Sequence, residues 1–179
     1  MSVGAPGPEL LGWWEVERRD LPWRATRDPW AVLVSELMLQ QTQVETVKPF
    51  FDRFMAKYPT VRHLAEAELE AVLALWQGLG YYTRARNLHR AAKDVAARPE
   101  AALPRTAAAL AALPGVGDYT AAAIASICFG ERVPVVDGNV ARVFARHDRL
   151  GDDFRAQPPR RALAKRLQPA FDATESPGD

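Results

Sequence analysis

The stretch that decides the fold reads Leu113-Pro114-Gly115-Val116-Gly117-Asp118-Tyr119-Thr120, and after a helical segment it continues as Val135-Val136-Asp137-Gly138-Asn139. Pro114 cannot continue a helix, and the two glycines permit backbone angles and close approaches that other residues resist. The turn therefore closes one helix at Ala112 and opens the next near Asp118. It leaves free backbone N–H groups at a helix N-terminus, which suit a phosphate.

Asp137 lies about twenty residues after this turn, between the apolar run 133–136 and Gly138. A carboxylate in that setting is partly desolvated. A single turn of this kind is as often a plain helical hairpin, and an aspartate before a glycine is more often a helix cap than a catalyst. Together, however, the two features suggest a protein that binds the phosphate backbone of nucleic acid and places a carboxylate for catalysis.

The composition is that of an ordinary folded protein, with 179 residues, 48% hydrophobic residues, 25% charged residues and a formal net charge of +1. This length permits one large domain or two small ones with a full core. The one cysteine, Cys128, excludes an internal disulfide framework and a multi-cysteine metal site, and its apolar neighbours predict a buried, inert thiol. There is neither an apolar run of about 18 residues nor a signal-peptide pattern, so we expect a cytoplasmic protein that does not enter a membrane.

Helical periodicity runs through the chain with almost no period-2 alternation, so we predict an all-α protein. Asp28 followed by Pro29 is a strong helix start. Residues 1–8 are expected to form a flexible N-terminus. The predicted helices cover about residues 9–18, 30–41, 44–57, 66–75, 83–97, 106–112, a segment from 118, 138–150 and 158–171.

Glu36 lies inside a predicted helix that is apolar nearly all round, which indicates a buried central helix. No basic residue stands within four positions of it, so burial should raise the pKa of its carboxyl group. A distant arginine could pair with this group in the fold. The alternative is a protonated acid poised to donate, and separated pairs of acids are how glycosidic bonds are cut.

Two turns have side chains suited to DNA. The first is Gln40-Gln41-Thr42-Gln43. Its amide and hydroxyl side chains are poorly suited to a hydrophobic core and well suited to hydrogen bonding with base edges. The turn at residues 76–82 presents apolar and aromatic groups that can wedge between stacked bases, although core anchoring is the usual role of a tyrosine.

These motifs resemble the helix-hairpin-helix DNA glycosylases of the endonuclease III superfamily, and most of all the adenine DNA glycosylases of the MutY type. The resemblance covers about residues 9–171 and rests on segments 21–24, 35–44, 76–82, 84–88, 113–117 and 136–140. It implies two α-helical lobes with a DNA cleft between them. A six-helix lobe containing the hairpin would span residues 27–132, and residues 9–26 with 133–179 would form the second lobe, which would be incomplete.

The resemblance also implies a reaction, the removal of adenine mispaired with 8-oxoguanine or guanine after the adenine has been flipped out of the duplex. Glu36 matches the acid that protonates adenine N7. Asp137 matches the carboxylate that stabilises or attacks the oxocarbenium-like sugar, and Asn139 would hold it. Tyr119 stands where bifunctional members carry a Schiff-base lysine, so the enzyme would be monofunctional. Some thymine-mismatch glycosylases share this tyrosine, but the segment 40–44 favours the adenine branch.

The same matches imply roles for the remaining site residues. The adenine pocket would be lined by Trp23, Arg24, Leu39 and Val44, with Arg19 nearby. The DNA or the lesion pair would be contacted by Gln40, Gln41, Thr42, Leu79 and Tyr81. The phosphate-binding hairpin would consist of Leu113, Gly115, Val116 and Gly117. No residue is assigned to a metal.

The chain departs from the family at its end. Members continue into a helix and four cysteines that bind a [4Fe-4S] cluster, and often into a Nudix-like domain, whereas this sequence stops at Asp179 and Cys128 is not one of those ligands. We therefore expect a truncated product that binds no cofactor itself and acts as a monomer on double-stranded DNA of the nucleoid. Two alternatives stay open, an inactive or weak DNA-binding remnant of such an enzyme and a purely structural helical module.

Overall fold

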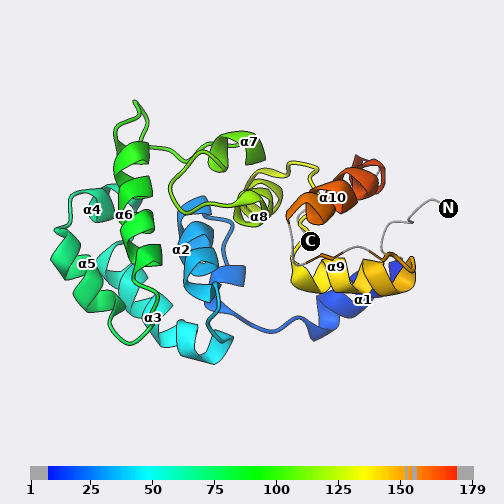
Figure 1. The fold of residues 1–179 in the computed structure, drawn as a ribbon. Helices are drawn as coiled ribbons and strands as arrows, with labels where there is room; N and C mark the ends of the chain where they lie inside the picture. Colours follow the sequence, from blue (N-terminus) through cyan, green and yellow to red (C-terminus); the bar gives the residue numbers. More distant parts are fainter. Residues whose placement is uncertain (1–7, 152, 155–156, 173–179) are drawn as a thin grey trace.

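A computed structural model describes residues 8–151, 153–154 and 157–172 of the chain. All regular elements in this part are helices, which confirms the predicted all-α class (Figure 1). In chain order they are α1 (Pro8–Glu17), the 3-10 helix η1 (Pro22–Arg24), α2 (Pro29–Leu39), α3 (Val44–Lys57), α4 (Val61–Ala65), α5 (Leu69–Trp76), α6 (Thr83–Ala96), α7 (Ala107–Leu110), α8 (Asp118–Phe129), α9 (Gly138–His147) and α10 (Gln157–Asp172). Of the predicted flexible N-terminus, residues 1–7 lie outside the described residues, and Pro8 begins α1.

Local chemistry accounts for most helix boundaries. The Asp28 carboxylate accepts a hydrogen bond from the Trp30 N–H at 3.1 Å, and Pro29 occupies the first helical position, as predicted for the start of α2. Two short elements, η1 and α4, were not predicted from the sequence. The five residues of α4 are too few to show a helical period, although the Thr60 side chain caps its first turn.

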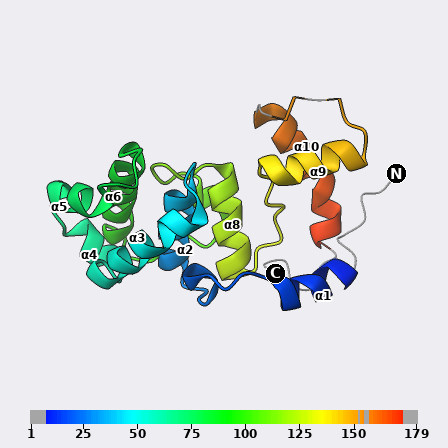
Figure 2. The same ribbon diagram turned by 90° about the horizontal axis from the view of Figure 1, so that it is seen from below.

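The central helix is α2, which is buried along most of its length. It packs against η1, α3, α6 and α8, and Trp30 Nε1 donates to the Tyr58 carbonyl oxygen at 3.0 Å. This confirms the expectation of a buried central helix carrying Glu36. Figures 1 and 2 show α3 to α6 at one end of the molecule and α1, α9 and α10 at the other, with α2 and α8 between them.

Buried apolar side chains form two clusters. The larger one draws on η1 and the helices from α2 to α8. The smaller one lies between α9 and α10, where its buried members are Val136, Ala141, Leu163 and Leu167. Leu21 and Trp23 pack in the larger cluster, although the predicted lobe boundary assigned residues 9–26 to the second lobe. Among the described helices, none has the length and apolar character needed to cross a membrane.

Candidate active site

Glu36 is half-buried in the C-terminal half of α2, beside the fully buried Leu37. Burial, and to a smaller extent the nearby Asp137 carboxylate, together raise the pKa of its carboxyl group to about 7. The direction is the one expected from the apolar surroundings of Glu36 in the sequence. The influence of Asp137 also shows that the fold places these two carboxyl groups near each other.

Asp137 is the N-cap of α9. Its Oδ1 accepts hydrogen bonds from the backbone N–H groups of Asn139 (2.8 Å) and Val140 (2.7 Å), and its Oδ2 accepts from Asn139 Nδ2 (3.0 Å). Arg142 Nη2 in turn donates to Asn139 Oδ1 at 3.1 Å. The cap role and the proposed catalytic role are therefore compatible, because the hydrogen bonds that cap the helix also fix the direction of the carboxylate.

Tyr119 lies in the first turn of α8, with 40% of its surface exposed. Burial of the phenol raises its pKa, and the carboxyl groups of Glu36 and Asp137 raise it further. Three titratable groups from α2, α8 and α9 thus act on one another. Such perturbed groups gather at functional sites more often than elsewhere.

The hairpin before α8 uses its two glycines differently. Gly115 has a φ of +78°, and a Cβ added there would lie 2.6 Å from the Cβ of Asn87 on α6, so both the backbone angle and the packing require glycine. A Cβ on Gly117, the N-cap of α8, would meet nothing within 4 Å. Leu113 and Val116 are buried in the larger cluster and hold the turn in place.

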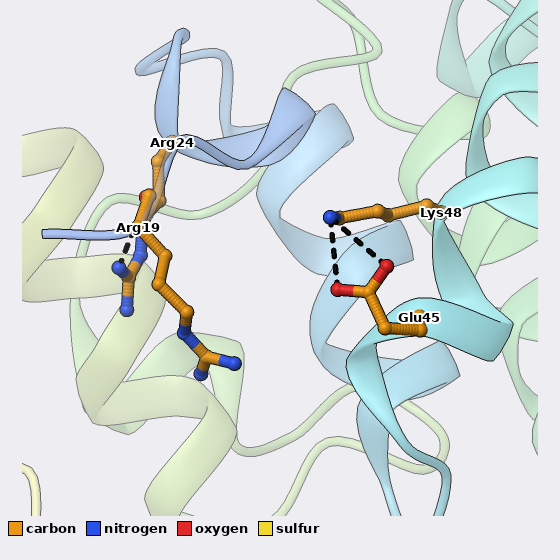
Figure 3. A network of polar contacts seen from close by, with 4 residues as sticks. All are labelled: Arg19, Arg24, Glu45 and Lys48. Atoms are coloured by element: carbon orange, nitrogen blue, oxygen red, sulfur yellow. Dashed lines mark hydrogen bonds and ion pairs between the residues drawn. The ribbon is translucent and has the colours of Figure 1, made fainter.

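Arg19 and Arg24, two of the residues predicted to lie at the adenine pocket, are neighbours in the structure. Figure 3 shows the side chains of Arg19 and Arg24 side by side, apart from the Lys48–Glu45 ion pair on α3. Arg24 Nη1 donates to the Arg19 carbonyl oxygen at 3.4 Å, and burial, Arg19 and Arg18 lower the pKa of Arg24.

Trp23 instead faces the core, where its ring meets that of Phe51 edge-on with the centroids 5.3 Å apart. The packing of Trp23 therefore holds η1 against the larger cluster, and its place in the adenine pocket stays a prediction. Leu39 and Val44 are half-buried and also pack against the larger cluster.

Among the predicted DNA contacts, Gln41 and Tyr81 are exposed at the tips of two turns, Tyr81 to 61%. Gln40 and Thr42 are half-buried. Leu79 differs from the expectation, because it is only 5% exposed and packs in the larger cluster. An apolar side chain placed there anchors its turn, and its contact with the lesion pair stays a prediction.

Arg84 joins these two turns, a role that the sequence did not predict. Its side chain is 7% exposed and donates hydrogen bonds to both of these turns. A signal was present, since Arg84 shares helical spacing with Leu88, Ala91 and Val95, which form the buried face of α6.

Cys128 is half-buried, whereas the sequence predicted a buried thiol. Burial is the main reason that its pKa is raised to about 11, so the thiol is protonated at neutral pH. An iron–sulfur cluster takes about four thiolate ligands, and the single cysteine of this chain does not fit one. The described residues contain no group of three His, Cys, Asp or Glu side chains that could hold a metal ion.

A surface hollow of about 740 Å³ lies at the N-terminal end of α2, bordered by Trp30, Arg62, Arg98, Arg105 and Phe129 among others. None of the predicted site residues lines it. It is therefore separate from the group formed by Glu36, Tyr119 and Asp137.

Comparison with known proteins gives matches over most of the chain. Residues 34–169 match the HhH-GPD superfamily of base excision DNA repair proteins. The adenine DNA glycosylase of Homo sapiens is 52% identical over an alignment of 153 residues that covers 80% of this chain and 28% of that protein. The chain thus spans less than a third of the length of this relative.

Two solved structures share the fold. A thermostable thymine-DNA glycosylase is 29% identical with a TM-score of 0.79, covering 90% of this chain and 74% of that one. A trapped covalent intermediate of endonuclease III with DNA is 25% identical with a TM-score of 0.74, covering 89% and 72%.

Proposed function

The chain belongs to the HhH-GPD superfamily of base excision DNA repair proteins, and from this premise we propose that it hydrolyses the N-glycosidic bond of adenine mispaired with 8-oxoguanine or guanine. The observation that carries the proposal is the placement of Glu36, with a pKa of about 7, beside the hydrogen-bonded carboxylate of Asp137. The identity of 52% to an adenine DNA glycosylase supports adenine as the base removed.

In the proposed mechanism the two carboxyl groups have different tasks. Glu36, half-buried and protonated in part near pH 7, donates its proton to N7 of the flipped adenine. The C1′–N9 bond then breaks, its electron pair leaves with the base, and positive charge develops on the sugar. The Asp137 carboxylate stabilises this charge until water adds to C1′ and gives its proton to the Glu36 carboxylate, which restores the acid. The backbone and side-chain donors of Asn139 keep that carboxylate in place.

DNA binding is proposed to begin at the hairpin. Free N–H groups at the N-terminus of α8 and the open space over Gly117 suit a phosphate. We propose duplex DNA containing an A:8-oxoguanine or A:G mispair as the partner, bound by one copy of the chain in the cytoplasm. The helices at the two ends of the molecule would be the lobes on either side of it, with the boundary near residues 26–27 and 132–133.

The deciding experiment is single-turnover release of adenine from an A:8-oxoguanine duplex, with Glu36→Gln as the matched control. A T:G duplex tests the thymine alternative, since a protein of that activity shares the fold. Release of thymine but not adenine would reverse the proposed base specificity.

A second candidate is a DNA-binding protein without activity, because the N-terminus of α8 and the open space over Gly117 suit a phosphate whether or not a base is released. Retention of duplex DNA on a filter without base release would favour this candidate. Absence of both would favour a purely structural module.

A further inference from the structure

Arg84 joins three parts of the molecule that are distant in sequence. Its Nη1 lies 3.1 Å from the Leu37 carbonyl oxygen and 2.7 Å from that of Met38, at the C-terminal end of α2. The same nitrogen lies 2.6 Å from the Gln40 carbonyl oxygen and 3.1 Å from Thr42 Oγ1, in the turn after α2.

The other arm of the guanidinium reaches the second turn. Nη2 donates to the carbonyl oxygens of Leu79 (3.2 Å) and Gly80 (3.1 Å), in the turn after α5. The rings of Trp76 and Tyr81 flank the guanidinium, with centroids at 5.7 Å and 5.3 Å. One planar fork therefore spans both turns, which a single ammonium group cannot do.

All these hydrogen bonds run to neutral oxygens, and among the described residues Arg84 has no carboxylate partner. Its Nε is buried without a hydrogen-bond partner. Burying a charge in this way is costly. The partial negative charge at the C-terminal end of α2 offsets part of that cost. A leucine would complete the apolar face of α6 at lower cost, so packing alone does not explain an arginine at this position.

The two turns that Arg84 joins have unusual backbone angles. Gln41 has a φ of 58° and Tyr81 a φ of 48°, in the left-handed region that residues other than glycine seldom adopt. Such strain persists only where surrounding contacts over-determine it, and it concentrates at functional sites. Both residues are exposed at the tips of their turns.

We propose that Arg84 is a positioning residue that fixes the separation of Gln41 and Tyr81, so that both side chains meet the duplex at the lesion together. This rests on the proposed function, since it assumes that the two tips contact DNA. Arg84 itself does not touch the reacting atoms and acts through the two turns. By holding the end of α2, it also links their position to the helix that carries Glu36.

The test compares the 179-residue chain with its Arg84→Lys variant. Lysine retains the charge and can reach one turn but not both. Arg90→Lys is the matched control, because Arg90 is exposed on the same helix and, among the described residues, its side chain donates to Asn87 and to neither turn. Hydrogen exchange is measured in the free proteins over residues 40–43 and 79–82. Adenine release and the fluorescence of 2-aminopurine placed next to the mispair are measured with DNA.

We expect both turns to exchange about tenfold faster in Arg84→Lys, with α3 and α6 unchanged. Binding to an undamaged duplex should stay within about twofold, because it depends on phosphate contacts. Adenine release should fall about 10- to 100-fold, since small displacements of a bound substrate cost rates of that order. The 2-aminopurine signal of unstacking should fall as well, and Arg90→Lys should resemble the parent.

A double-mutant cycle separates positioning from general support. If Arg84 acts through the turn tips, Gln41→Ala and Tyr81→Ala will cost much less in the Arg84→Lys background than in the parent. Fully additive losses would overturn the proposal. So would unchanged exchange in the two turns, or a uniform rise in exchange across α2, α3 and α6, which would mark a merely structural role.

Failure of the proposed function can be told apart from failure of this inference. If the parent releases no adenine, the proposed activity is wrong, while exchange and 2-aminopurine unstacking still decide the role of Arg84. If Arg84→Lys does not fold, Thr42→Val removes one acceptor of the same fork. Faster exchange confined to residues 40–43 and 79–82 in that variant would support the proposal, and unchanged exchange there would contradict it.

Discussion

At the scale of single residues, Glu36 is placed where its charge opposes folding. Its folded-state pKa of about 7 lies above the ordinary value of 4.5, so the native protein binds this proton more tightly than the unfolded chain does. The stabilisation from that proton is fully present below about pH 4.5 and is lost as the pH rises through about 7. A group that costs stability at neutral pH and sits beside a second carboxylate is typical of a catalytic acid.

The Glu36→Gln variant should therefore become more stable relative to the parent as the pH rises. Between pH 4.5 and pH 8 the difference in unfolding free energy should grow by about 3 kcal/mol, because each pKa unit corresponds to about 1.4 kcal/mol. Urea titrations of both proteins at several pH values measure it. Parallel stability curves would show that Glu36 titrates normally in the folded protein.

The same substitution should remove activity without removing binding. Glutamine keeps the shape and loses the proton, so single-turnover adenine release should fall about 10²–10⁴-fold. Affinity for the mispaired duplex should be nearly unchanged. In the parent, the rate should decline as the pH rises through about 7, because the general acid must be protonated. A variant that releases adenine at the parental rate would contradict the assignment.

Tyr119→Lys tests the mechanism of bond cleavage. The lysine amine would lie in the partly desolvated position near Glu36 and Asp137, where it could attack the sugar carbon and form an imine. The variant should gain strand cleavage and a covalent adduct trapped by borohydride, and the parent should show neither. Parental adenine release must be established first. No adduct from the variant would show that residue 119 does not face the sugar, and one from the parent would refute the monofunctional assignment.

At the scale of elements, the two glycines of the hairpin between α7 and α8 have different roles. Gly115 is needed for folding, and Gly117 leaves space for a bound molecule. Gly115 is required by its backbone angle and by its contact with Asn87, whereas the space over Gly117 is open. A side chain at position 117 would therefore be tolerated by the protein and would obstruct only a molecule approaching from outside.

Gly117→Val should weaken binding to all duplexes about equally, because phosphate contacts carry no sequence information. Its melting temperature should stay close to that of the parent. Gly115→Ala, the matched variant, should instead lower the melting temperature, since the new Cβ would clash with Asn87. Filter binding with lesion-containing and undamaged duplexes, together with thermal melts, measures both. Loss of affinity for lesion-containing DNA alone would show that the turn reads bases.

At the scale of the whole molecule, the site joins parts that belong to different buried clusters. Glu36 is carried by a helix of the larger cluster, and Asp137 caps α9, which packs in the smaller one. The separation of the two carboxyl groups therefore depends on how firmly the smaller cluster holds α9.

Leu163→Ala should loosen α9 and α10 without unfolding the larger cluster. Leu163 is one of the few fully buried side chains in the smaller cluster, and such a truncation costs about 2–5 kcal/mol. We expect faster hydrogen exchange confined to α9 and α10, together with slower adenine release because Asp137 is less firmly placed. Val143→Ala, on the exposed side of α9, is the control. Equal loosening of α2 to α6 would show that the clusters unfold as one unit.

Features that depend on neighbours along the chain could be predicted from the sequence. Helical periodicity predicted the all-α class, the Asp28-Pro29 pair predicted the start of α2, and the apolar neighbours of Glu36 predicted its raised pKa. The motifs also led to the family, which the match over residues 34–169 confirms. The physical reason is that capping, helix period and local desolvation act within one or two turns.

Contacts between side chains that are distant in sequence were seen only in the fold. The fold places Asp137 and Tyr119 near Glu36 and buries Trp23 and Leu79 in the core. It also gives Arg84 its hydrogen bonds to the turn after α2 and the turn after α5. Residues 42 and 84, or 36 and 137, carry no local signal of their proximity. Their contacts depend on how α2, α6, α8 and α9 pack, and that packing is set by apolar burial summed over the whole chain.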